Sequence, residues 1–185
     1  MSLDRGRVES LAAEYAETEP LYAVEADHVE TLPKAFASGE YGRRDAEWVV
    51  QWYYRRFLGS YPDDDRQAVE DAFESNDFDA IRTAITAATN ADDAASAIDR
   101  LTDLDGVDVP VASAFLFYID PTAYIVVGRR EWAALVDAGR LTEPYPDPPR
   151  RSDYSRYLEV CLSVSADVEC DLWTLYRALW RCASE

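Results

Sequence analysis

Apolar residues recur along most of this chain at the spacing of an amphipathic helix, whereas the strict alternation of a half-buried strand is nearly absent. Near the start, the apolar positions from Leu3 to Tyr15 fall on one helical face. The stretch "RRDAEWVVQWYYRRF" at 43–57 places Trp48, Val49 and Trp52 on neighbouring faces of a second helix. Both segments carry charges on the opposite side, which predicts helices that pack on a core.

The same pattern continues through the middle of the chain. Pro62 and the three aspartates after it suit a helix N-terminus, because proline lacks the N–H that is unpaired there and carboxylates favour the positive end of the dipole. A short helix is expected over 77–89. The next one is expected from Asn90 to Leu104, with Asn90 or Asp92 as its N-cap.

The last third predicts a stiff connector followed by two helices. The segment "PYPDPP" at 144–149 cannot form a regular helix because of its prolines. The segments 151–165 and 170–184 follow, the second with apolar residues at i, i+3, i+4, i+7 and i+8. In all, nine or ten helices are expected, in one all-α domain over 1–185 or in two small lobes that share a core.

Between two of these helices lies "LDGVDVPVASAFLFYI" at 104–119. Gly106 permits a sharp backbone turn that a residue with a Cβ resists, and Pro110 is acceptable in the first turn of a following helix. That following helix begins with small residues and is apolar almost all round. The pattern predicts a tight helical hairpin whose second helix is buried in the middle of the protein.

The charge balance is extreme, with 36 acidic residues against 18 lysines and arginines and a formal net charge of −18. Such a surface repels itself in dilute buffer, and molar salt screens that repulsion. The composition is typical of halophilic proteins. Because acidity of this kind is an adaptation of the whole surface, it says little against a nucleic-acid partner, and local basic clusters matter more.

Several classes of protein are not indicated by the sequence. No apolar stretch approaches the length needed to cross a bilayer and the first residues have no secretory signal pattern, so a cytoplasmic protein without a membrane partner is expected. Cys161, Cys170 and Cys182 have no metal-binding spacing and are expected to be reduced core residues. The lone histidine, His28, has no second ligand nearby in the sequence. No transition metal or cofactor is therefore expected.

Arginine pairs and aromatic residues are the remaining candidates for binding. Arg129 with Arg130 is one of five small basic clusters. Each cluster could bind an anionic partner or simply form ion pairs with the abundant carboxylates. An aromatic group has two interpretations, stacking on a base or packing in the core. Its members are Trp48, Trp52, Tyr53, Tyr54 and Trp132.

The stretch "LDGVDVPVASAFLFYIDPTAYIVVGRREWAAL" resembles the helix-hairpin-helix of the DNA glycosylase superfamily, especially uncharacterised members with a "GVGVPVASAIL" hairpin. The helix "EWVVQWYYRR" and the closing "SRYLEVCLSV" and "LWTLYRALW" are similar to theirs, so the resemblance spans about 45–183. It implies an all-α, glycosylase-like domain with the helix-hairpin-helix at about 90–120 and two lobes that flank a base pocket. In that family the hairpin N–H groups hold a DNA phosphate, often with an alkali cation on its carbonyls.

Carried over residue by residue, the resemblance assigns nucleic-acid binding to Gly106, Val107, Asp108 and Val109 of the hairpin. As a nucleic-acid binding module, the chain would add Arg129 and Arg130 as phosphate contacts. Trp132, which follows these two arginines, is the candidate pocket residue.

The chain departs from the family at the catalytic positions. The family has glycine where this chain has Asp108, whose carboxylate opposes a phosphate. Pro110 stands where bifunctional members have the Schiff-base lysine, and Gly128 stands where an aspartate stabilises the cationic sugar. Asp120 and Glu131 are not in register with that aspartate. An aspartate of the last helix in related sequences is matched by Tyr176.

Three functions follow from these observations. The first is a non-catalytic helix-hairpin-helix protein that binds the DNA backbone through the hairpin. The second is a structural or interaction protein in which the hairpin only connects helices and aromatic side chains fill the pocket. The third is an active base-excision enzyme that uses an atypical carboxylate. No catalytic residue is assigned.

Overall fold

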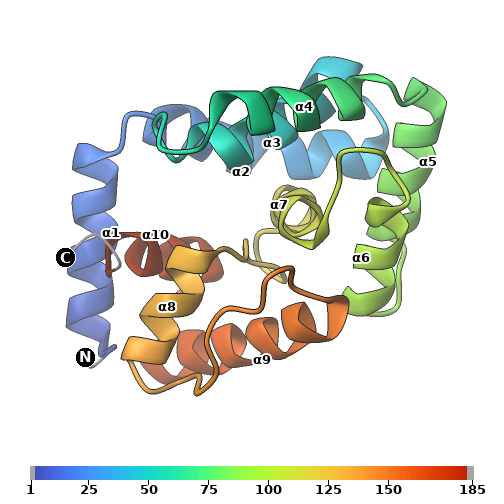
Figure 1. Cartoon of the computed structure of the whole chain (residues 1–185). Helices are drawn as coiled ribbons and strands as arrows, with labels where there is room; N and C mark the ends of the chain where they lie inside the picture. Colours follow the sequence, from blue (N-terminus) through green and yellow to red (C-terminus); the bar gives the residue numbers. More distant parts are fainter. Residues whose placement is uncertain (1–2, 183–185) are drawn as a thin grey trace.

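The computed structural model describes residues 3–182, and these residues form ten α-helices without a strand (Figure 1). The helices are α1 (Arg5–Thr18), α2 (Tyr22–Ser38), α3 (Arg43–Arg55), α4 (Asp63–Glu74), α5 (Phe78–Thr89), α6 (Ala94–Thr102), α7 (Val109–Ile119), α8 (Arg129–Asp137), α9 (Arg151–Val168) and α10 (Leu172–Cys182). The expectation of an all-α chain is confirmed. One hydrophobic cluster includes buried side chains from all ten helices.

Four helices begin at an aspartate whose side chain accepts a hydrogen bond from the first turn. Asp4 accepts from the Arg7 N–H at 3.0 Å, Asp93 from Ser96 at 2.7 Å, Asp108 from Val111 at 2.9 Å and Asp171 from Thr174 at 2.6 Å. The predicted N-cap of α6 at Asn90 or Asp92 was wrong, because residues 90–93 form the connection from α5 and Asp93 caps the helix. The predicted end at Leu104 was also too late, since α6 stops at Thr102.

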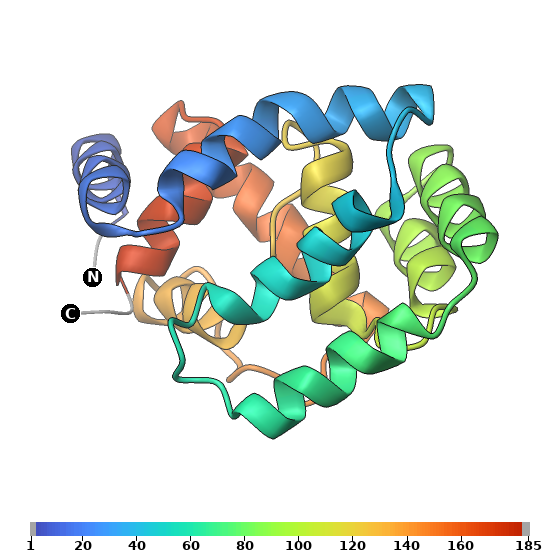
Figure 2. The ribbon, with the colours of Figure 1, turned by 90° about the horizontal axis from the view of Figure 1, so that it is seen from above.

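Helix α7 is the centre of the molecule, and the other helices surround it (Figures 1 and 2). It contacts α2, α3, α5, α6 and α9. Every residue from Pro110 to Ile119 is buried, as the nearly uninterrupted apolar sequence predicted. The small residues at its start allow other backbone segments to approach closely.

One such segment is the extended stretch Ile125–Val127, which is buried and joins α7 to α8. Buried backbone groups must be hydrogen-bonded, and this stretch has no strand partner among the described residues. Ser113 accepts a hydrogen bond from the Val127 N–H at 3.0 Å. Three tyrosine hydroxyls donate to the successive carbonyls: Tyr154 to Ile125 at 3.2 Å, Tyr157 to Val126 at 2.9 Å and Tyr53 to Val127 at 3.3 Å.

The hairpin between α6 and α7 turns at Gly106, which has φ +76°. A Cβ at this position would lie 2.6 Å from the Val69 carbonyl oxygen and 2.8 Å from the Phe73 nitrogen, so the backbone of α4 packs directly on the turn. The Asn76 side chain fixes the neighbouring residue, donating to the Asp105 carbonyl at 2.9 Å and accepting from the Asp105 N–H at 3.0 Å. Gly106 is therefore required both for its conformation and for close packing.

Helix α2 continues through Pro33 and brings a carboxyl group into the core. Glu25 is fully buried, and it accepts hydrogen bonds from the Trp52 Nε1–H at 2.7 Å and from the Tyr15 hydroxyl at 2.8 Å. Burial raises the pKa of this carboxyl above its usual value. Glu25 thereby joins α1, α2 and α3 through hydrogen bonds. The spacing of apolar residues in the sequence does not predict these contacts.

Two further expectations concern membrane-spanning helices and the cysteines. None of the helices in the described chain is long and apolar enough to span a bilayer. The three cysteines are free thiols; Cys161 and Cys182 are buried and Cys170 is half-buried.

The turn at Gly106 generates a stability prediction. The variant Gly106→Ala should lose at least about 2 kcal/mol of unfolding free energy, because the new Cβ combines left-handed strain with a collision against the α4 backbone. The neighbouring variant Asp108→Asn should lose less than about 1 kcal/mol, since asparagine caps helices as well as aspartate. Urea denaturation of both variants at one fixed molar salt concentration measures the difference. Equal losses would show that the turn does not depend on glycine.

Candidate binding cleft

A cleft of about 460 Å³ lies next to the hairpin, and its lining combines aromatic, acidic, basic and proline side chains. The cleft is lined by the end of α3 and the loop after it, by the N-termini of α7 and α8, and by residues of the segment 145–149. Its lining residues are Tyr53, Tyr54, Phe57, Tyr61, Asp108, Pro110, Arg129, Tyr145, Asp147, Pro148 and Pro149. Segments far apart in the sequence therefore meet here.

Two helix N-termini open on this cleft. Asp108 is the N-cap of α7, and Arg129 is the first residue of α8. The unpaired N–H groups and the dipole at a helix N-terminus favour negative charge. Asp108 supplies that charge from within the chain, because its Oδ1 accepts the hydrogen bond from Val111. The residue is accessible to solvent, yet the walls of the cleft exclude enough water to raise the pKa of its carboxyl.

The structure separates the two arginines that the sequence paired. Arg129 lies at the cleft, where it forms an exposed ion pair with Asp147 and approaches the Tyr145 ring, 5.1 Å from its centroid. Arg130 instead packs over the Trp180 ring at 4.0 Å and donates to the Trp180 carbonyl at 3.1 Å. Partial burial lowers the pKa of Arg130. Arg130 therefore supports the core beside the cleft and does not line it.

Trp132, the candidate pocket residue, is also placed in the core. It is 2% exposed, its Nε1–H donates to the Glu143 carbonyl at 2.8 Å, and its ring stacks on Tyr157. The edge of Tyr145 packs against it, so Tyr145 occupies the cleft wall in its place. Trp132 therefore does not line this cleft, and its indole N–H is satisfied by the Glu143 carbonyl.

The remaining aromatic candidates divide between core and cleft. Trp52 is buried among aromatic rings, and Trp48 stacks on His28 with 3.8 Å between the ring centroids. Tyr53 and Tyr54 come from the other side of the same helix and line the cleft. Two other aromatic lining residues, Tyr61 and Tyr145, could not be found from the sequence, because they follow α3 and α8 in irregular segments without periodicity.

Behind the cleft lies a buried ion pair between α3 and α8. The Arg56 Nη1 is 2.6 Å from the Glu131 Oε1, and both side chains are almost fully buried. Five aromatic rings surround the guanidinium within 6 Å, and the Tyr176 hydroxyl lies 3.3 Å from Nη1. Rings of this kind stabilise a cation that has been removed from water.

This ion pair explains the glycine at 128. A Cβ there would lie 2.5 Å from the Glu131 Oε2 and 2.9 Å from the Arg56 Nη2. Both of these atoms are buried and have no hydrogen-bond partner within the described residues. The space beside Gly128 is thus already taken by charged groups, and an aspartate at this position would have to displace them. Asp120 is used locally, accepting from the Thr122 N–H at 3.0 Å.

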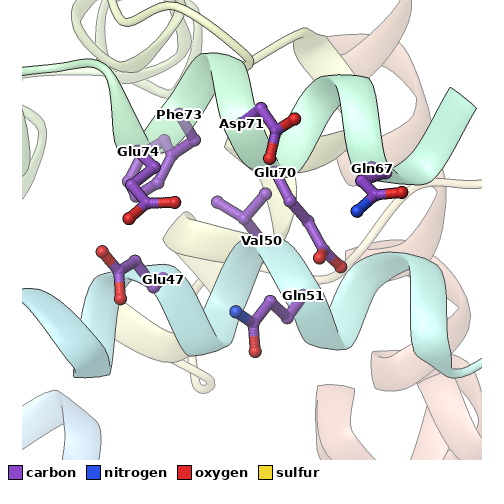
Figure 3. Close-up of a pocket in the computed structure, with 8 residues that line it drawn as sticks. All are labelled: Glu47, Val50, Gln51, Gln67, Glu70, Asp71, Phe73 and Glu74. Carbon is purple, nitrogen blue, oxygen red and sulfur yellow. The ribbon is translucent and has the colours of Figure 1, made fainter. Parts of the chain in front are cut away.

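A second hollow, of about 290 Å³, lies between α3 and α4 (Figure 3). Its polar lining is acidic: Glu47, Glu70, Asp71 and Glu74, with Gln51 and Gln67 beside them. Within residues 3–182 no group of three or more histidine, cysteine or acidic side chains is arranged to hold a metal ion. The hollow between α3 and α4 has one aromatic lining residue, Phe73, and no basic one, whereas the cleft beside the hairpin is lined by five aromatic side chains and Arg129. We therefore assign the candidate site to that cleft.

The buried ion pair generates a double-mutant prediction. Removing one partner, as in Glu131→Met or Arg56→Met, should cost about 3–5 kcal/mol of unfolding free energy, because the other charge is left buried without compensation. Replacing both with methionine should cost less than either single change. Denaturant titrations of the four proteins measure the coupling, and additive losses would contradict it.

Searches against protein-family models, curated proteins and solved structures find no match to this chain. The resemblance to helix-hairpin-helix glycosylases therefore stays a prediction from the sequence.

Proposed function

We propose that this chain is a non-catalytic helix-hairpin-helix protein that contacts a nucleic-acid backbone through residues 106–109 and Arg129. The observation that supports this proposal is that the N-termini of α7 and α8 open on one cleft beside the Gly106 turn. Backbone N–H groups at helix N-termini and a nearby arginine are the usual ligands of a phosphate.

The shape of the loop after α3 also suits a nucleic acid. Leu58 has φ +51° and is 59% exposed, although leucine rarely adopts a left-handed conformation and usually avoids water. The preceding residue, Phe57, lines the cleft. An apolar side chain held outward beside an aromatic cleft can insert between bases, as wedge residues do in proteins that distort nucleic acids.

Two carboxylates moderate this function. Asp108 occupies the N-terminus of α7, and Asp147 pairs with Arg129. A phosphate has to compete with both, so the affinity is expected to be low and to depend on how these charges are compensated.

A second candidate is an interaction protein whose hairpin has no nucleic-acid role. Packing of Gly106 on α4 is by itself sufficient reason for the glycine. In addition, no arginine or lysine pairs with Asp108 in the described part of the chain, which favours a partner with a positive charge.

The two candidates differ in the effect of charge changes at the cleft. If the hairpin contacts phosphate, Asp108→Asn should tighten binding of a labelled DNA duplex about 3- to 10-fold, because an anion beside the phosphate is removed. Arg129→Gln should weaken binding and reduce the slope of log affinity against log salt by about 1. Fluorescence anisotropy across salt concentrations at which circular dichroism shows the folded protein measures both effects.

Arg140→Gln is the matched control, because Arg140 forms a surface ion pair with Asp167 at the other end of α8. It should leave the affinity unchanged. Absence of duplex binding by both the unmodified protein and Asp108→Asn would refute the proposed function.

We further predict that the protein neither excises bases nor nicks abasic DNA. Pro110 offers no amine for a Schiff base, and the ion pair fills the space beside Gly128 that a stabilising carboxylate would need. Borohydride trapping on abasic DNA should fail, and uracil, alkylated and oxidised bases should remain. Excision that Asp108→Asn abolishes would contradict this prediction and identify the cleft carboxylate as catalytic.

A further inference from the structure

The walls of the cleft are formed largely by aromatic rings. Five of its lining side chains are aromatic: Tyr53, Tyr54, Phe57, Tyr61 and Tyr145. Four of them form a contiguous wall, with 5.2 Å between the centroids of Tyr53 and Tyr54, 4.8 Å between Tyr54 and Tyr61, and 6.1 Å between Phe57 and Tyr61. The fifth, Tyr145, belongs to the segment after α8. The faces of such rings carry the negative part of the quadrupole.

The charge inside the cleft has the same sign. Three charged side chains line it, Asp108, Asp147 and Arg129, which leaves a formal charge of −1. The arginine is already paired with Asp147 at the mouth of the cleft. Asp108 uses Oδ1 to cap α7 and has no cationic partner within residues 3–182. A carboxylate without a counter-ion is therefore placed among aromatic rings.

The charge of Asp108 acts on the tyrosines of the cleft. Burial raises the pKa of Tyr53, Tyr54, Tyr61 and Tyr145, and the charge of Asp108 raises the pKa of each further. Asp108 and these four tyrosines line the same cleft. An added anion in this space would meet the same repulsion, whereas a cation would relieve it.

We propose that this cleft binds a small organic cation with a methylated ammonium group. Methylated ammonium ions are weakly hydrated and fit among aromatic rings, and their charge complements the unpaired carboxylate of Asp108. The volume of about 460 Å³ lies within the usual range for small-molecule sites. The proposal does not rest on the proposed nucleic-acid contact. The two ligands carry opposite charges and would compete for the same cleft.

The test compares choline with its uncharged isostere, 3,3-dimethylbutan-1-ol. Isothermal titration at fixed molar ionic strength, with choline chloride replacing sodium chloride, should show saturable binding of choline and at least about 5-fold weaker binding of the alcohol. Asp108→Asn retains the helix cap and should weaken choline binding at least about 5-fold. Tyr61→Ala should weaken it similarly, while Tyr61→Phe should not, because Tyr61 is half-buried and contributes through its ring.

A peptide that carries trimethyl-lysine provides a second arm. Binding at least about 10-fold tighter than that of choline identifies the cation as a side chain of a partner protein, and equal or weaker binding identifies a free small molecule. Equal affinities for choline and the alcohol would overturn the proposal, since they indicate hydrophobic contact alone. So would an unchanged affinity in Asp108→Asn. If that variant is not folded, the alcohol and the Tyr61 pair still decide the question. Duplex binding is measured separately, so either proposal can fail without the other.

Discussion

The ion pair between Arg56 and Glu131 is the contact on which the centre of this molecule depends. Removing both charges from water is costly, and the cost is offset only while the aromatic rings and the Tyr176 hydroxyl stay around the guanidinium. These groups come from α3, α8 and α10, so three helices are held in one arrangement. The pair also leaves no room for a side chain at residue 128, the N-cap of α8.

Much of the helical architecture could be predicted from the sequence, because the chain marks it locally. The apolar run after Pro110 can only be a buried helix, and Gly106 at the preceding turn has the positive φ that this reasoning required. Helix α2 carries weaker signals: Pro33 interrupts its pattern, and one of its buried residues is Glu25, which a period of apolar residues cannot reveal. Its carboxyl is buried because Tyr15 and Trp52, both remote in sequence, donate to it.

The residues of the cleft were harder to predict, because tertiary contacts decide which side chains line it. Adjacent arginines at 129 and 130 look equivalent in the sequence, but successive helical residues point about 100° apart, and one meets Trp180 while the other meets solvent. Trp132 was a candidate because it follows the two arginines next to Gly128, yet its indole N–H donates to the Glu143 carbonyl in the loop after α8. The residues that do line the cleft lie partly in loops, where position is decided by tertiary contacts and not by spacing along the chain.

The extended segment Ile125–Val127 has a consequence for how the chain folds. Its three carbonyls are bonded to hydroxyls from α3 and α9, so the segment has no local structure of its own and cannot be stable before those helices have docked. Contacts of this kind link regions separated by 29 to 74 residues. Because they join remote segments, they favour an all-or-none transition. An intermediate without α9 would expose an apolar, strand-prone tripeptide with unpaired backbone groups, which could pair with another chain.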